Sequence, residues 1–461
     1  MPPKFGTSGL RGLVDELTPD CVAAYVQAFL TSCPTGAGLC IGHDLRPSSP
    51  AIAAVVAAVA RDRGSRVFDC GAVPTPALAL RAQTRACAAV MVTGSHIPAD
   101  RNGLKFYTPA GEITDAEQAA ILSALAPAAA PAPSAPAEGD GSCAQDYLDR
   151  YARAFGPQAL SGLRIGIHEH STVARDLMAQ AVRALGGQAL PFDRSDTFVA
   201  LDTEALAPEL RHRLAAEVRA QGLNAILSAD GDADRPLVVD DRGRVVPGDI
   251  LGPLSARYLG AEILCTPVTS NSAVDAMGFT RVRRTAIGSP KVIEAMVAEG
   301  AGRRAVAGYE ANGGFLLGFD AKGPAGPLPA LMTRDSMLPA LVPLVAAAER
   351  GITLSDFVDT VPPRFTAADR LTEFPPARAR ALIARLLEEP AALQLMLDGL
   401  GAEVARDLTD GLRLTLAGGD VVHLRPSGNA PELRCYGESA LPERAAALVA
   451  GMLARVEHFR E

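Results

Sequence analysis

Apolar strands and amphipathic helices alternate along most of the chain. Three stretches each consist of an apolar strand, a helix and another apolar strand, and each ends in a polar loop that contains glycine. This order is typical of doubly wound α/β units with a parallel sheet. The expected elements are strands 39–41, 66–70 and 88–92 with helices 49–62 and near Thr75; strands 163–167 and 224–227 with helix 172–185; and strands 263–265, 282–285 and 304–307 with helices near Ser272 and from Pro290. We therefore predict three similar doubly wound α/β domains.

The C-terminal segment breaks this alternation. From about residue 363 the pattern gives a helix over 377–387, short strands at 413–416 and 421–424, and a closing helix over 443–456. Such an order favours an α+β domain that acts as a lid. Segment 126–142, between the first two units, is rich in Ala and Pro and is predicted to be a linker that does not pack. The predicted domains are 1–135, 143–250, 251–362 and 363–461.

Composition and charge narrow the class of protein. The chain has 461 residues, 48% hydrophobic and 21% charged, which suits a soluble α/β protein with several cores. A net charge of −8 argues against a nucleic-acid partner, which needs a broad basic surface. No signal-like run and no apolar stretch of about 18 residues occur, so we expect a cytoplasmic protein with no membrane partner. The eight cysteines form no C-x-x-C pair, so neither a zinc site nor a redox motif is indicated.

Three carboxylates crowd one of the predicted loops. Asp230, Asp232 and Asp234 lie in D-G-D-A-D-R, and they repel one another unless a cation holds them. Oxygen ligands select a hard ion such as Mg²⁺. A calcium loop of the EF-hand type is an alternative, but its sixth position would be Arg235 instead of Gly and its twelfth Asp241 instead of Glu. A solvated acidic turn is the other alternative.

Ser95 is the candidate nucleophile. It follows a predicted strand in T-G-S-H-I-P, with His96 beside it and Lys105 ten residues on. The G-x-S-x-G elbow of acyl hydrolases is absent, which disfavours an esterase. A serine that only caps a loop is the structural alternative.

Two further segments suit anions. R-P-S-G-N-A-P at 425–431 offers a guanidinium, a hydroxyl, an amide and free backbone N–H groups, although it could be a simple reverse turn. F-G-T-S-G-L-R-G at 5–12 places Arg11 between glycines, where backbone can approach an anion closely, although it could be a flexible tail.

Together these segments resemble one family. The N-terminal, serine, metal and phosphate motifs occur in the order and spacing of the α-D-phosphohexomutase superfamily, most like its bacterial phosphomannomutase and phosphoglucomutase group, over nearly the whole chain. The resemblance implies four domains around a central cleft, with the first three sharing one fold. It also implies that Ser95 carries a phosphoryl group, and that one phosphate oxygen holds Mg²⁺ together with Asp230, Asp232 and Asp234.

The resemblance also implies roles for other residues. The catalytic set would add Lys105 and Arg11 for acid/base transfer and charge stabilisation, Arg235 to position the phosphoserine, and His96 to support the serine loop. Glu310 would bind sugar hydroxyls. No residue is assigned to the C2 hydroxyl, although Asn312, in the same loop, is a candidate to reach it. The phosphate that does not react would be held by Arg425, Ser427, Gly428 and Asn429.

The implied reaction interconverts hexose 6-phosphate and hexose 1-phosphate through a hexose 1,6-bisphosphate, with mannose and also glucose as the sugar. A phosphoglucosamine mutase, a metal-dependent sugar phosphatase and a non-catalytic sensor are the alternatives, and the E-Q-S-G-H loop of the first is absent. The family's histidines are missing from the sugar loop 310–314 and from Gly288-Ser289-Pro290-Lys291, where Ser289 or Lys291 could replace the lost contacts. A monomer and a homodimer both stay open.

Overall fold

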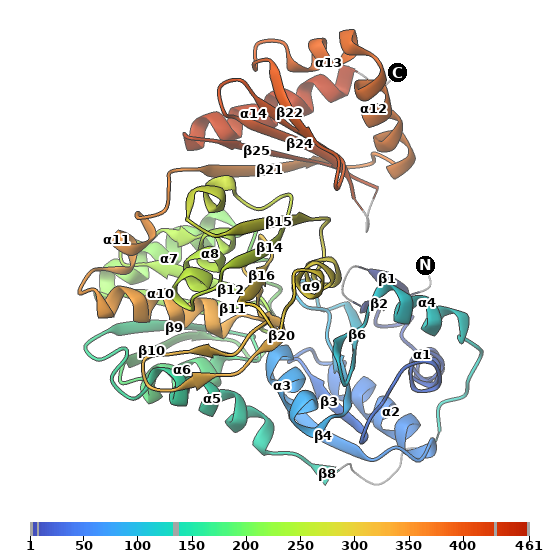
Figure 1. Cartoon of the computed structure of the whole chain (residues 1–461). Coiled ribbons are helices and arrows are strands. Elements are labelled where there is room, and N and C mark those ends of the chain that lie inside the picture. Colours follow the sequence, from blue (N-terminus) through green and yellow to red (C-terminus); the bar gives the residue numbers. More distant parts are fainter. Residues whose placement is uncertain (1–2, 7–8, 132–137, 428–430, 459–461) are drawn as a thin grey trace.

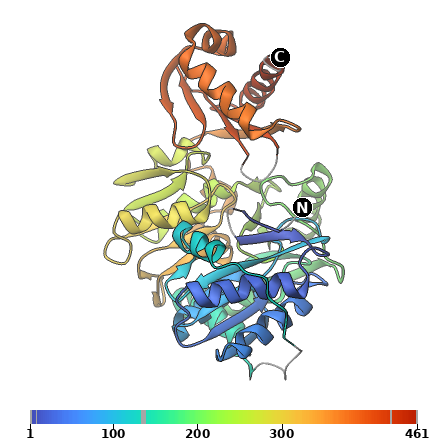
Figure 2. The same ribbon diagram turned by 90° about the vertical axis from the view of Figure 1, so that its right-hand side faces the viewer.

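The computed structural model describes residues 3–6, 9–131, 138–427 and 431–458. Three α/β sheets and their helices form the larger part of the molecule, and a fourth, antiparallel sheet stands above it with its own helices (Figure 1). A quarter turn shows the fourth part resting on the third and separated from the first (Figure 2).

The first sheet follows the order β1-β2-β6-β5-β3-β4-β8, with β7 paired to β6. Helices α1 and α2 pack on one face of it and α3 on the other. The bounds are β1 (Lys4–Gly6), β2 (Gly9–Leu13), α1 (Pro19–Ser32), β3 (Leu39–His43), α2 (Ser49–Asp62), β4 (Val67–Ala72), α3 (Thr75–Arg85), β5 (Ala88–Val92), β6 (Arg101–Thr108), β7 (Gly111–Glu112), α4 (Asp115–Ser123) and β8 (Glu138–Gly139). The helix 49–62 and strand 88–92 predicted from the sequence are confirmed.

The second and third sheets repeat the topology of the first. In each, a central strand lies parallel to two neighbours, and the second of these pairs antiparallel with the next strand: β4-β3-β5-β6, β10-β9-β11-β12 and β15-β14-β16-β17. The second group comprises α5 (Ser142–Phe155), β9 (Arg164–His170), α6 (Arg175–Ala184), β10 (Gln188–Arg194), α7 (Pro208–Gln221), β11 (Ala225–Ala229), β12 (Pro236–Asp240) and β13 (Val245–Val246). The prediction of three similar α/β units is therefore confirmed.

The third group differs from the sequence prediction at one helix. It comprises α8 (Gly248–Tyr258), β14 (Ile263–Pro267), η1 (Ser272–Ala276), β15 (Arg281–Thr285), α9 (Ser289–Ala298), β16 (Val306–Tyr309), β17 (Phe315–Leu317), β18 (Ala321–Lys322), β19 (Pro327–Leu328), β20 (Leu331–Asp335), α10 (Met337–Glu349) and α11 (Leu354–Val358). The helix expected near Ser272 is only the short 3₁₀ turn η1. Asn271 caps its start and Gly278 follows its end with a positive φ, which leaves no length for an α-helix.

The C-terminal sheet is antiparallel, in the order β21-β25-β24-β23-β22. Its elements are β21 (Phe365–Leu371), α12 (Pro376–Glu388), α13 (Pro390–Leu397), β22 (Glu403–Asp407), β23 (Leu412–Leu416), β24 (Val421–Pro426), β25 (Leu433–Ser439) and α14 (Pro442–His458). Alternate residues of β23 and β24 pack under the helices in a core that lies wholly between 374 and 456. The predicted α+β class of this segment is confirmed.

The segment predicted as an unpacked linker, 126–142, is ordered at both described ends. Ala128 and Ala130 lie against the first core, and the Ala130 N–H donates to Asp20. Further on, β8 pairs with β4, and the buried Asp140 accepts hydrogen bonds from Arg81 and Arg85. The prediction was wrong there because backbone pairing and ion pairs need no large apolar side chain. Residues 132–137 lie outside the described part.

One apolar core continues from the first sheet through the second to the third, by way of α5 and α10. On α5, Tyr147 donates a hydrogen bond of 2.7 Å to Asp335 of the third unit, and Tyr151 donates to the same carboxylate. These three units therefore form one packed body. Among the described residues, none of the helices combines the length and apolar character needed to cross a membrane.

Candidate active site

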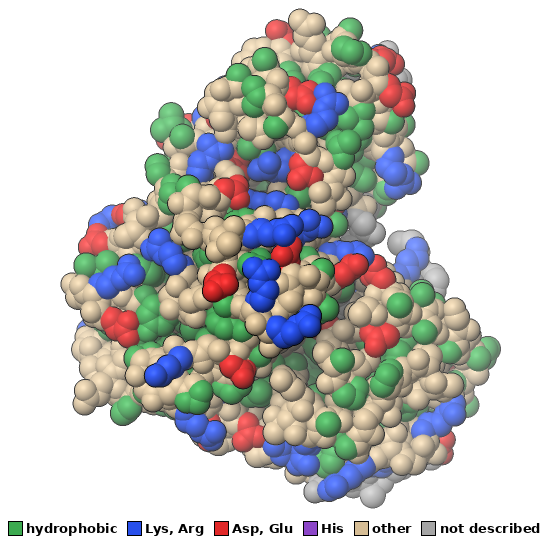
Figure 3. All heavy atoms as spheres, viewed as in Figure 1, with side chains coloured by type: hydrophobic (Ala, Val, Ile, Leu, Met, Phe, Trp, Pro, Cys, Tyr) green, Lys and Arg blue, Asp and Glu red, His purple; other side chains and the backbone are tan. Residues whose placement is uncertain are grey.

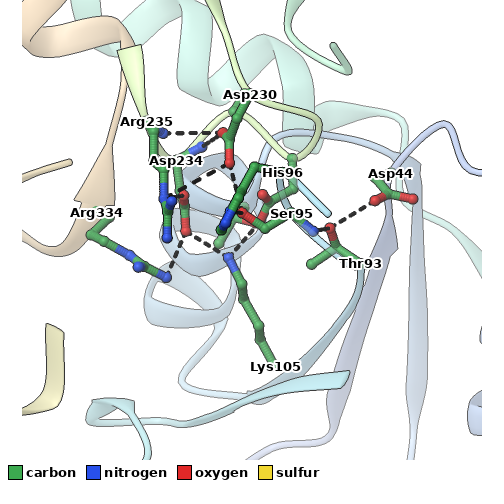
Figure 4. A network of polar contacts seen from close by, with 12 residues as sticks. Asp44, Thr93, Ser95, His96, Lys105, Asp230, Asp234, Arg235 and Arg334 are labelled. Atoms are coloured by element: carbon green, nitrogen blue, oxygen red, sulfur yellow. Dashed lines mark hydrogen bonds and ion pairs between the residues drawn. The ribbon is translucent and has the colours of Figure 1, made fainter. Parts of the chain in front are cut away.

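The serine loop and the acidic loop meet at the centre of the molecule. Ser95 follows β5 and its Oγ donates a hydrogen bond of 2.6 Å to Oδ2 of Asp230, which follows β11 (Figure 4). Both side chains are buried. Carboxyl ends of parallel strands carry ligand sites in open α/β sheets, and here two such ends face each other. The structure thus brings together the two motifs that the sequence singled out first.

The backbone at Ser95 is held in an uncommon conformation. Ser95 has φ +55°, which few residues other than glycine adopt. The hydroxyl of Thr93 accepts the Ser95 N–H at 2.8 Å and donates to Asp44 at 2.7 Å. Non-glycine residues in this region cost energy and mark sites where the surroundings impose the geometry. The loop is therefore built to aim the Ser95 hydroxyl.

Arg46 supports the same loop, and the sequence analysis did not identify it. The guanidinium is fully buried, and its three nitrogens donate to Asp44 and to four backbone carbonyls, those of Ser95, Ile97, Pro98 and Arg101. The ring of Phe198, from the second unit, lies over it at 4.0 Å. All five N–H donors of the group find acceptors. An arginine in H-D-L-R gives no signal of such a role before the loop is folded around it.

The three aspartates that the sequence predicted as metal ligands lie close together, in a group that could hold a metal ion. Asp230, Asp232 and Asp234 are fully buried, and one ligand oxygen from each lies within 4.8 Å of the others. Oδ1 of Asp232 and Oδ1 of Asp234 are buried with no hydrogen-bond partner among the described residues. Unpaired buried carboxylate oxygens are costly unless a cation binds them. This donor set fits a hard divalent cation such as Mg²⁺.

Cations balance this acidic cluster. Lys105 Nζ lies 2.5 Å from Asp232 Oδ2 and 2.6 Å from Asp234 Oδ2. Burial and the adjoining carboxylates raise the pKa of Asp230. For Asp234 burial acts in the same direction, but the charges of Arg334, Lys105 and Arg235 outweigh it and lower the pKa of this carboxyl. Asp234 is therefore more firmly ionised than Asp230.

The other predicted catalytic residues lie around this centre. Arg235 Nε is 3.7 Å from Asp234 and 4.0 Å from Asp230. His96 Nδ1 is 3.4 Å from Ser95 Oγ, and burial with the nearby Arg235 and Arg11 lowers the pKa of His96 to about 2, so the imidazole is neutral. Arg11 on β2 pairs with Gly103 on β6, and burial, Arg235 and Arg334 lower its pKa to about 10.

The sugar loop reaches the same centre through Arg334, a second arginine that sequence reasoning missed. Arg334 on β20 lies with one Nη 2.7 Å from Asp234 and the other 3.2 Å from Glu310. Glu310 and Asn312 are both buried. Arg334 lies between Glu310, the predicted sugar carboxylate, and Asp234 of the acidic cluster. Asn312 uses its side-chain oxygen to accept the Gly314 N–H at 3.0 Å, within its own turn.

The phosphate loop stands apart from this centre. Arg425, at the end of β24, has its nearest carboxylate in Asp410 of the same sheet, at 3.4 Å. Ser427 is buried and its N–H donates to the Glu432 carbonyl at 2.9 Å. The predicted phosphate ligands Gly428 and Asn429 lie outside the described residues. A hollow separates the fourth part of the molecule from the first unit on the face shown in Figure 3.

The two residues suggested as substitutes for the missing histidines contact carboxylates of the first unit. Ser289 Oγ donates to Glu112 at 2.7 Å, and Lys291 Nζ lies 2.7 Å from Asp115. Beside them is a cavity of about 250 Å³, lined also by Gly9 and Lys105. Lys291 is thus paired with Asp115 across the domain boundary, and the replacement of the missing histidine contacts by Ser289 or Lys291 stays a prediction.

Comparison with known proteins agrees with this architecture. Family models described as phosphoglucomutase/phosphomannomutase, alpha/beta/alpha domains I, II and III, match residues 2–130, 145–243 and 247–365. The chain is 42% identical to a phosphomannomutase of Sinorhizobium fredii, over 98% of each chain, and 40% identical to one of Salmonella muenchen, over 98% of this chain and 95% of the other. A crystal structure of a phosphoglucomutase/phosphomannomutase family protein from Burkholderia thailandensis superposes with a TM-score of 0.77 at 20% identity, covering 98% of this chain and 97% of that one.

Proposed function

Because the chain belongs to the phosphoglucomutase/phosphomannomutase family, we propose that it is a phosphomannomutase that interconverts mannose 6-phosphate and mannose 1-phosphate. The observation that carries the proposal is the contact of 2.6 Å between Ser95 and Asp230, which joins a buried hydroxyl to a buried carboxylate triad. A phosphoryl group on Ser95 would be next to the three carboxylates, and a cation bound by them would balance its negative charge.

Asp230, Asp232 and Asp234 would hold Mg²⁺ together with an oxygen of phosphorylated Ser95. The bound ion would neutralise charge on the transferring phosphoryl group. The protein contributes the Oδ1 atoms of Asp232 and Asp234, which accept no hydrogen bond from the described residues. Arg235, whose Nε lies 3.7 Å from Asp234 Oδ1, would steady the phosphoserine. Neutral His96 supports the loop without adding charge.

The transfer itself exchanges one P–O bond for another. The bond between phosphorus and Ser95 Oγ breaks, and phosphorus forms a bond to the oxygen of the free sugar hydroxyl. The proton of that hydroxyl passes to Ser95 Oγ, so that a hexose 1,6-bisphosphate results. Lys105 and Arg11 assist the proton transfer and stabilise charge on the reacting oxygen. The bisphosphate then turns over, and its other phosphate returns to Ser95. The net reaction is an isomerisation that consumes no water.

The substrate is held at both ends. Glu310 addresses the sugar hydroxyls, and Arg425 and Ser427, with Gly428 and Asn429, hold the phosphate that does not react. Because the bisphosphate binds in two orientations, this one clamp serves both the 1-phosphate and the 6-phosphate.

A phosphatase is the main rival, because the same groups could hydrolyse phosphoserine if water reached it. The Ser95 side chain is only 1% exposed, which favours the mutase. We test this with mannose 1-phosphate, Mg²⁺ and a trace of hexose 1,6-bisphosphate, followed by ³¹P NMR. Mannose 6-phosphate without inorganic phosphate is the expected product. Inorganic phosphate as the main product would establish the phosphatase, and no turnover would leave a sensor.

We further propose that the enzyme accepts glucose phosphates as well. The two sugars differ only at C2, and no residue is assigned to reading that carbon. Asn312, the one candidate to reach the C2 hydroxyl, has its amide oxygen engaged by the Gly314 N–H. Loose contacts discriminate by about 1 to 3 kcal/mol, or roughly ten- to two-hundredfold. We therefore expect kcat/KM for mannose 1-phosphate to exceed that for glucose 1-phosphate by no more than this. A ratio above roughly a thousand on one preparation would contradict dual specificity.

A further inference from the structure

Arg334 connects the acidic cluster with the sugar loop. Its side chain is 2% exposed and comes from β20, which carries none of the four motifs identified in the sequence. One arm of the guanidinium lies 2.7 Å from Oδ2 of Asp234 (Figure 4). The other arm lies 3.2 Å from Oε2 of Glu310. A single planar group therefore bridges a metal carboxylate and a sugar carboxylate.

The bridge uses one oxygen of each carboxylate and leaves the other. Oδ2 of Asp234 accepts from Arg334 and Lys105, whereas Oδ1 has no hydrogen-bond partner among the described residues. Glu310 likewise meets Arg334 through Oε2, and the described part of the chain gives its Oε1 no hydrogen bond. A rigid fork fixes the rotation of both carboxylates, which a flexible ammonium group does not do.

The sugar loop is packed against this bridge. A Cβ on Gly314 would lie 2.9 Å from the Arg334 methylene carbons and 3.0 Å from the Asp234 carbonyl oxygen. The loop thus approaches Arg334 as closely as glycine permits. The metal loop and the sugar loop therefore pack closely together around this one side chain.

We propose that Arg334 is a positioning residue that makes Asp234 a one-oxygen metal ligand and, through the same guanidinium, aims Glu310 at the sugar. This inference rests on the proposed function. With Oδ2 occupied, Asp234 presents Oδ1 alone, which suits the strict octahedron of Mg²⁺ and disfavours Ca²⁺, an ion that accepts two oxygens from one carboxylate. Lys105 also donates to Oδ2, at 2.6 Å, but its single flexible ammonium group does not fix the rotation of the carboxylate as the planar guanidinium of Arg334 does.

Metal preference gives the first test. Arg334→Met keeps the length of the side chain and removes the fork, and Mg²⁺ and Ca²⁺ are titrated separately into sugar-free protein by calorimetry. We expect the ratio of Mg²⁺ to Ca²⁺ affinity to fall about tenfold, because Oδ2 of Asp234 then keeps only the flexible Lys105 as a partner and the carboxylate can turn both oxygens toward the ion. Loss of a positive charge alone would strengthen both ions equally, and damage to the fold would weaken both. An unchanged ratio overturns the proposal.

Sugar binding gives the second test. In Arg334→Met we expect KM for mannose 1-phosphate to rise about tenfold, since Glu310 loses the partner that orients it. Arg334→Lys keeps the charge but can reach only one carboxylate, so it should restore one readout at most. A lysine variant that restores both would also overturn the proposal.

Arg81 provides a matched control, because it bridges Asp140 and Asp146 in the same manner at a distance from the acidic cluster. Arg81→Met should leave the metal ratio and KM at wild-type values, and a change equal to that in Arg334→Met would show that the effect is not specific to the bridge. If wild-type protein shows no mutase turnover, the proposed function fails, whereas the metal ratio still decides the role of Arg334.

Discussion

The serine–aspartate centre and the phosphate loop are built in opposite ways. At the centre, side chains from three sheets are buried together and interlocked: Ser95 and Lys105 from the first, Asp234 from the second, Arg334 and Glu310 from the third. The phosphate loop belongs to a sheet with a separate core, and Arg425 finds its carboxylate partner within that sheet.

The junction between these two parts is largely polar. Ser272 donates to Glu438, the Ile287 N–H donates to Asp410 at 3.1 Å, and the Asn271 amide donates to the Arg364 carbonyl at 2.8 Å. Such contacts exchange with water at small net cost. We infer that the chemistry occurs in a rigid body, and that the distal phosphate is held by a part able to shift when the bisphosphate turns over. Changes at Ser95 and the aspartates should therefore reduce kcat, whereas changes at the clamp should raise KM.

Ser95→Ala should have the largest effect. The substitution removes the hydroxyl that contacts Asp230 and touches no core, so mutase activity should fall at least a thousandfold, a barrier increase of about 4 kcal/mol. A coupled assay measures turnover, and the exposed Ser161→Ala serves as control. If Ser95→Ala kept activity within about tenfold of wild type, the phosphoserine assignment would be wrong.

Asp232→Asn should come next. It removes one ligand charge, keeps the shape, and preserves an acceptor for Thr75, so we expect turnover to fall roughly a hundredfold together with weaker Mg²⁺ activation. Asp176→Asn, at an exposed ion pair with Arg194, controls for loss of charge alone. An unchanged metal titration in Asp232→Asn would remove this residue from the ligand set.

Arg425→Ala tests the other side of the comparison. A charge-assisted contact contributes about 1.5 to 3 kcal/mol, so KM should rise roughly ten- to a hundredfold while kcat changes little. The same rise is expected for 1-phosphate and 6-phosphate substrates. Arg406→Ala, which breaks an ion pair with Glu403 on the same sheet, provides the control. A defect in one direction only would contradict a clamp shared by both orientations.

Asp249, near the junction, should give the smallest effect, on stability. Burial, opposed in part by the Asn271 N–H and supported by Glu438, raises the pKa of Asp249 to about 7. A folded pKa above the unfolded value means that stability is lost as pH rises from about 4 to 7. The side chain introduced by Asp249→Asn stays uncharged at every pH. The stability of this variant relative to wild type should therefore be higher at pH 8 than at pH 4, by about 1 to 4 kcal/mol in the free energy of unfolding. Urea unfolding at both pH values checks this, and a pH-independent difference would contradict it.

Some features of the fold and of the serine–aspartate centre could be predicted from the sequence, and others could not. The sequence predicted the repeated α/β units, helix 49–62 and the grouping of the three aspartates, because each depends on local periodicity or close spacing. Arg46 and Arg334 were not, because their roles arise from partners that only the folded chain brings near. The packed ends of segment 126–142 were missed for a similar reason, since a short strand needs only a neighbouring edge.

Because Arg46 packs against the serine loop, the effects of substitutions at positions 46 and 94 should depend on each other. A Cβ on Gly94 would come within 2.7 to 2.9 Å of the Arg46 guanidinium, so even alanine there must displace the group that holds the serine loop. Alanine at 94 and a shorter residue at 46 would each be harmful alone, and harm from the first would shrink once the second is present. The two positions should consequently show strong epistasis. A larger residue at 94 should be tolerated better in a variant that already has a shorter residue at 46.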